Sequence, residues 1–78
     1  MAVDQLMSPT EAAAYAEKLQ AVVEDFSALG HGSRLQASLD IGVSSSRVTG
    51  VLKFRGVDEK ILDQLAMWAA EQRQLRGI

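Results

Sequence analysis

A run of hydroxyl and basic side chains between Arg34 and Arg55 holds most of the chemistry that this sequence offers. Serine and threonine hydroxyls both donate and accept hydrogen bonds, and lysine and arginine bind phosphate oxygens. Arginine can also donate two bonds to the acceptor edge of guanine. These side chains together predict contact with DNA through a set of nine residues: Arg34, Ser44, Ser45, Ser46, Arg47, Thr49, Gly50, Lys53 and Arg55.

Two residue types in this set have a second explanation. One of the three consecutive serines is expected to act only as a helix cap. Gly50 would cost about 1 kcal/mol relative to alanine inside a helix. A close approach either of DNA or of another helix would account for it, and the sequence does not separate the two.

The charge of the chain is unevenly distributed, although its net value is −2. Residues 34–56 carry four basic side chains against one acid, a net of +3, whereas residues 1–33 carry −4 and residues 57–78 carry −1. Because the local potential rather than the net charge attracts phosphate, this basic segment favours nucleic-acid binding. A chance cluster of charges on a solvated surface is the alternative.

Two short helices that meet at Gly42 would position these side chains. A left-handed residue just after a helix is least strained when it has no Cβ, so Gly42 is expected to form the turn. The first helix is predicted over about 33–40, with Ser33 as its N-cap and one buried side formed by Leu35, Leu39 and Ile41 together with the small Ala37 and Ser38. The second is predicted over about 44–54, with an inward side formed by Val48, Val51 and Leu52.

This segment resembles the helix-turn-helix core of the lambda Cro and repressor family (XRE type) of small DNA-binding regulators. The match lies in a small residue four before the glycine, an apolar residue on either side of it, then serines and an apolar position six beyond: Ser38, Ile41, Gly42, Val43, Ser44, Ser46, Val48, Val51 and Leu52. The resemblance covers about 19 of the 78 residues.

The resemblance implies a sequence-specific transcriptional regulator of phage or prokaryotic type, most often a repressor that occupies an operator. Its partner would be double-stranded DNA, bound as a homodimer with half-sites about 34 Å apart. The helix after Gly42 would enter the major groove. The protein would then be cytoplasmic and associated with the nucleoid.

Two longer helices are expected to flank this pair. Ser8, Pro9 and Glu11 predict a helix start with a reciprocal cap, and the helix is expected to run over about 9–29. Its apolar stripe is predicted from Ala12, Ala16, Leu19, Val22, Val23 and Phe26. A last helix over about 58–74 is predicted to bury Ile61, Leu62, Leu65, Ala66 and Ala69. The fold class is therefore all-α, a bundle of four helices in a single domain over residues 1–78, with a flexible arm at 1–7 and a tail at 76–78.

Trp68 has two possible environments in this fold. It either completes the core or projects with neighbouring apolar residues into a partner. The second possibility makes Met67, Trp68 and Leu75 the candidate dimer interface.

Other functional classes find little support in the residues. The chain has no cysteine, which fits a reducing compartment and removes disulfides and thiolate metal sites. His31 is the single histidine and is expected to be an ordinary loop residue. We expect no enzyme, no cofactor, no metal site, no signal peptide and no membrane span. The alternative to DNA binding is a protein-interaction module (an adaptor, an antitoxin-like partner or a phage protein that binds a host factor), favoured by the acidic first helix and the apolar last one.

Overall fold

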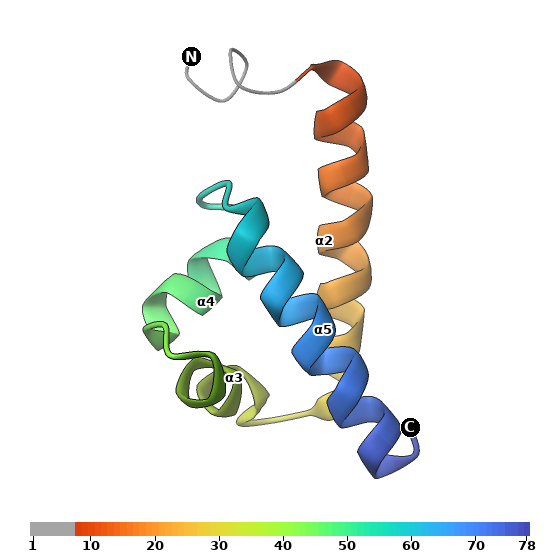
Figure 1. The fold of residues 1–78 in the computed structure, drawn as a ribbon, viewed down its shortest axis with the longest axis vertical. Helices are drawn as coiled ribbons and strands as arrows, with labels where there is room; N and C mark the ends of the chain where they lie inside the picture. Colours follow the sequence, from red (N-terminus) through yellow and green to blue (C-terminus); the bar gives the residue numbers. More distant parts are fainter. Residues whose placement is uncertain (1–7) are drawn as a thin grey trace.

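The computed structural model describes residues 8–78 and places four helices in them: α2 (Pro9–Leu29), α3 (Ser33–Ile41), α4 (Ser45–Leu52) and α5 (Glu59–Arg76). In Figure 1, α5 runs diagonally beside α2, and the shorter α3 and α4 lie on the left. This range contains no strand, which confirms the prediction of an all-α fold with four helices. The predicted arm at 1–7 lies outside the described residues. Over residues 8–78, every helix is too short or too polar to cross a membrane.

The start of α2 is the predicted one. The Glu11 N–H donates to Ser8 Oγ at 3.1 Å, and the Ser8 N–H donates to Glu11 Oε1 at 3.0 Å, with Pro9 in the first turn. The predicted apolar stripe is partly wrong, because Ala12 and Ala16 are exposed. The buried side is formed by larger residues at spacings of three and four, which remove more apolar area from water: Tyr15, Leu19, Val22, Phe26 and Leu29.

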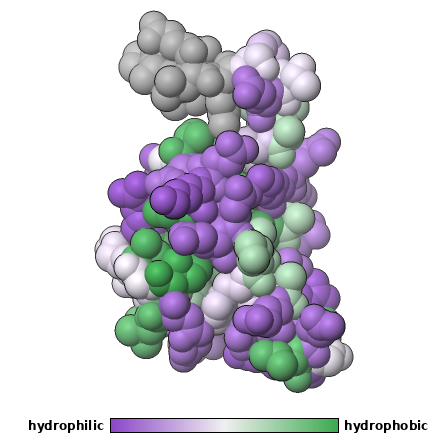
Figure 2. Space-filling view, viewed as in Figure 1, coloured by the Kyte–Doolittle hydropathy of each residue, from purple (hydrophilic) through white to green (hydrophobic). Residues whose placement is uncertain are grey.

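The prediction for the buried side of α3 is partly wrong, although Ile41 packs against the core as predicted. Leu35 and Leu39 are 57% and 68% exposed, whereas Ala37 and Ser38 are buried. Small residues on the inner side let α3 approach its neighbours closely, and the Ser38 hydroxyl donates to the Leu35 carbonyl at 2.7 Å, so its burial leaves no unpaired donor. In Figure 2, hydrophobic atoms gather over α3 and its turn into α4.

Ser33 is also not the N-cap that the sequence predicts. It is the first residue of α3 and is buried, and its hydroxyl donates to the Gly30 carbonyl at 2.9 Å. Gly32 takes the cap position with φ 86° and offers no side-chain oxygen. The hydroxyl thus ties the start of α3 to the end of α2.

The last two helices differ from their predicted ranges at their ends. α4 stops at Leu52 rather than near Phe54, because Phe54 adopts φ 58° and the Arg55 N–H donates back to the Gly50 carbonyl at 2.8 Å. The Phe54 ring stacks on Tyr15 with centroids 5.9 Å apart. α5 extends to Arg76, so the predicted tail shortens to residues 77–78.

Trp68 lies in the core of this fold, which answers the question that the sequence left open. It is 7% exposed, its ring stacks on Phe26 with centroids 5.5 Å apart, and its Nε1–H donates to Asp40 Oδ2 at 2.8 Å. Trp68 therefore leaves the candidate dimer interface, whereas Met67 and Leu75 are each 75% exposed. Apolar side chains from all four helices form the core with it: Tyr15, Leu19, Val22, Phe26, Leu29, Ala37, Val48, Val51, Leu52, Ile61, Leu62, Leu65 and Ala69.

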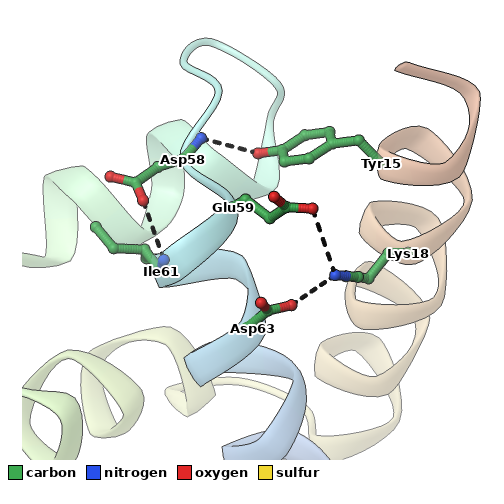
Figure 3. A network of polar contacts seen from close by, with 6 residues as sticks. All are labelled: Tyr15, Lys18, Asp58, Glu59, Ile61 and Asp63. Atoms are coloured by element: carbon green, nitrogen blue, oxygen red, sulfur yellow. Dashed lines mark hydrogen bonds and ion pairs between the residues drawn. The ribbon is translucent and has the colours of Figure 1, made fainter. Parts of the chain in front are cut away.

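Ion pairs join α2 to α5 outside this core. Lys18 Nζ lies 2.6 Å from Asp63 Oδ1 and 3.9 Å from Glu59 Oε2, as Figure 3 shows. Farther along, Arg73 Nη1 contacts Asp25 Oδ1 at 2.7 Å. These ion pairs connect α2 to α5 at two places along their length, outside the apolar core that packs the two helices together.

Candidate nucleic-acid interface

The turn between α3 and α4 is built around Gly42, as the sequence predicts. Gly42 has φ 86° and ψ 29°, the left-handed conformation. The N–H groups of Gly42 and Val43 both donate to the Ser38 carbonyl, at 2.9 and 3.1 Å, which closes the end of α3. Ser44 then caps α4, since its Oγ accepts a bond from the Arg47 N–H at 3.1 Å. Of the three serines, Ser44 is thus the one used for capping.

The helix α4 has one apolar and one polar side. Val48, Val51 and Leu52 are buried, as the spacing predicts. The opposite side is open and includes a shallow depression of about 320 Å³. We call this side the α4 face; the depression on it is lined by Ser45, Ser46, Thr49, Gly50 and Arg55.

Gly50 faces open space on the α4 face. Apart from its chain neighbours and the backbone of its own helix, no heavy atom of residues 8–78 lies within 4 Å of the position that a Cβ would take there. Within residues 8–78, no second helix therefore accounts for this glycine. The position remains open to close approach by another molecule.

Arg47 lies at the border of the α4 face and is paired with Asp58. Its Nη2 is 2.6 Å from Asp58 Oδ2 across a depression of about 260 Å³ between α4 and the loop that leads to α5. Asp58 is itself fixed by two further bonds, drawn in Figure 3. Its Oδ1 accepts from the Ile61 N–H at 3.0 Å, and its own N–H donates to Tyr15 Oη at 3.1 Å.

These contacts lower the pKa of Asp58. The largest cause is the hydrogen bond from the Ile61 N–H, followed by the bond from Arg47 and the attraction of its charge. Each of them favours the ionised carboxylate over the protonated acid.

The lowered pKa predicts a pH-dependent contribution of Asp58 to stability. A carboxyl group with a depressed pKa in the folded state stabilises the fold above its unfolded pKa, near 3.8, and loses that contribution as the pH falls through its folded pKa. We therefore expect Asp58→Asn to melt below the wild type at pH 5–7, with the gap closing as the pH is lowered from about 4 toward 2. Thermal melts across this range would measure it, and a gap that stays constant or widens at low pH would contradict it.

Three other basic residues of the predicted set differ from Arg47. Lys53 and Arg55 follow α4 directly, are exposed, and have no carboxylate within 4.0 Å in the part of the chain that the structure describes. Arg34 is exposed too but lies elsewhere. It lines a separate pocket of about 420 Å³ with His31 and Leu52, between the end of α2 and the start of α3. The structure thus brings most of the predicted residues to the α4 face and leaves Arg34 apart from them.

Sequence reasoning missed Tyr15 and Asp58 as parts of this region. The sequence predicts the start of this helix near residue 58, but the bond between Asp58 and Arg47 joins residues 11 positions apart, and the bond between Asp58 and Tyr15 joins residues 43 apart. No local pattern reports such contacts.

Metal binding finds no support among residues 8–78, where no three His, Asp or Glu side chains come close enough to hold an ion. Comparisons of this chain with protein-family models, with curated proteins and with solved structures found no match.

Proposed function

We propose that the protein is a sequence-specific DNA-binding regulator of transcription, of the repressor type, that places α4 in the major groove. The observation that carries this proposal is the α4 face, which residues 8–78 leave uncovered, with hydroxyls along it and, at its end, Lys53 and Arg55, which have no carboxylate within 4.0 Å in that range. An eight-residue helix is about 12 Å long, and the major groove is about 12 Å wide, so the whole face could enter.

The residue types on the face suggest a division of roles. Ser45, Ser46 and Thr49 would meet base edges, because hydroxyls both donate and accept hydrogen bonds. The missing side chain at Gly50 would let the helix backbone come near the groove floor. Lys53 and Arg55 would bind phosphates, which supply much of the affinity of a DNA-binding protein.

The proposed complex contains two copies of the chain on one duplex. A two-fold site is read by a dimer whose recognition helices lie one turn of DNA apart. Because Trp68 is buried in the core, the candidate contact between copies consists of Met67 and Leu75, which are exposed on α5.

Selection of duplexes from a random library, followed by a salt series, tests this proposal. We expect Lys53→Gln and Arg55→Gln each to weaken binding about five- to tenfold at 0.1 M salt. Each variant makes one phosphate contact fewer and so releases about one counterion fewer. The salt slope, which is the slope of the logarithm of the binding constant against the logarithm of the salt concentration, should therefore be shallower by about one. Arg76→Gln is the matched control, since it removes the same charge at the C-terminal end of α5 and should change binding less than about twofold. Sedimentation of the complex should give two chains per duplex.

Equal effects of all three substitutions would show that the α4 face is not the DNA-binding surface. A wild-type chain that selects no sequence would contradict the proposal as a whole.

The second candidate is a protein-interaction module, and the exposure of Leu35 and Leu39 on α3 favours it. Exposed leucines at positions i and i+4 lie on one side of a helix and could meet an apolar partner. Capture from nuclease-treated extract tests this candidate. It would be favoured by a stoichiometric protein partner whose binding is lost with Leu35→Lys and retained with Met67→Lys, provided that the chain has no affinity for DNA.

A further inference from the structure

The ion pair between Arg47 and Asp58 divides the basic residues near the α4 face into two kinds. Lys53 and Arg55 have no carboxylate within 4.0 Å among residues 8–78, whereas the charge of Arg47 is balanced at 2.6 Å by the Asp58 carboxylate. A paired guanidinium adds little to the long-range attraction of phosphates, because the field of the pair falls off faster than that of a single charge. Its remaining N–H groups can still donate, since the Arg47 side chain is more than half exposed.

Asp58 is rigidly placed for this pairing. One carboxylate oxygen is used by the Ile61 N–H and its backbone N–H is used by Tyr15, so its second oxygen is left for Arg47. The acid stands at the start of a helix whose first turns pack in the core through Ile61 and Leu62. Arg47 is thus held by a fixed acceptor.

We propose that Asp58 is a specificity-determining residue, which neutralises and orients Arg47 so that Arg47 discriminates between DNA sequences without adding to non-specific attraction. This inference rests on the proposed DNA binding. An arginine held in one place donates well only where a base edge offers acceptors in the right position, whereas a released arginine also binds any phosphate within reach.

The substitution Asp58→Asn separates this role from helix capping. Asparagine is as good an N-cap as aspartate, so its side-chain oxygen can still accept from the Ile61 N–H. The substitution removes the charge that balances Arg47. We expect binding to a random-sequence duplex to strengthen about five- to tenfold at 0.1 M salt, with a salt slope steeper by about one, because one cation is released to phosphates. Preference for the selected duplex over the random one should fall by a similar factor.

Two variants control this experiment. Asp63→Asn makes the same change in net charge at the contact of α5 with Lys18 on α2, away from the α4 face, and should change random-duplex binding less than about twofold. The double variant Arg47→Gln/Asp58→Asn removes the pair as a whole. It should bind the random duplex within about twofold of the wild type and should also lose preference for the selected duplex.

The outcomes separate this inference from the function on which it rests. A wild type that binds neither duplex overturns both. A wild type that binds, with Asp58→Asn no different from Asp63→Asn, overturns the role of Asp58 alone. Melting curves followed by circular dichroism verify that each variant is folded, and Asp58→Ser, which also supplies an N-cap oxygen, takes the place of Asp58→Asn if that variant does not fold.

Discussion

Replacing Trp68 with alanine is expected to lower the free energy of unfolding by about 3–5 kcal/mol. The indole is nearly completely buried and stacks on Phe26, so its removal leaves a cavity and also removes apolar burial. A domain of 78 residues has a total stability on the order of 4–12 kcal/mol, so this loss is a large fraction of it. Urea unfolding of the variant and the wild type would measure the difference.

The neighbouring Met67 gives the matched control for this prediction. Its side chain is mostly exposed, and Met67→Ala should change the unfolding free energy by no more than about 0.5 kcal/mol. The two residues are adjacent and both apolar, but one points into the core and the other into solvent. Similar losses for both variants, or a small loss for Trp68→Ala, would contradict the placement of Trp68 in the core.

Replacing Gly42 with valine is expected to destabilise the fold by more than about 1 kcal/mol, or at least about 4–8 °C in the melting temperature. The backbone at Gly42 is left-handed, and a β-branched residue is poorly tolerated there. Apart from its chain neighbours, no heavy atom of residues 8–78 lies within 4 Å of the position of the added Cβ, so the loss comes from backbone strain and not from a clash. Thermal unfolding by circular dichroism would measure it.

Gly50→Ala is the matched control, and its expected effect has the opposite sign. Gly50 lies inside α4, and its added Cβ also meets open space. Alanine there should raise the unfolding free energy by about 0.5–1 kcal/mol, because glycine loses more backbone freedom in a helix. A Gly42→Val variant that melts with the wild type would show that Gly42 is not the left-handed residue of the turn.

Features that depend only on neighbouring residues could be predicted from the amino-acid sequence. The cap at Ser8 and Glu11, the left-handed turn at Gly42 and the inward side of α4 were all predictable. Each is fixed by bonds or spacings within about five residues, where local backbone physics decides the conformation. The four-helix class follows from the same local signals.

Which apolar residues are buried and which charges are paired depends on how the four helices pack together, so neither could be fully predicted from the sequence. Leu35 and Leu39 were reasonable core residues by spacing, but the close packing of α3 selects Ala37 and Ser38 for its inner side. The sequence does not show which of Trp68 and Met67 is buried. In the folded chain, Trp68 contacts Phe26 of α2 and Asp40 of α3, whereas Met67 is exposed. The end of α4 depended on Phe54, whose left-handed backbone accompanies stacking of its ring on Tyr15 in another helix.

The candidate interface shows the same division. Ser45, Ser46, Thr49 and Gly50 share a face because the periodicity of a helix puts them on one side, so their grouping could be predicted from the sequence. Arg47 lies at the border of this face and Arg34 lies apart from it. The pairing of Arg47 with Asp58 could not be predicted, because it depends on how α4 and the start of α5 are brought together by the core. Contacts between distant residues are fixed by the packing of whole helices, and a linear sequence does not record that packing in any local pattern.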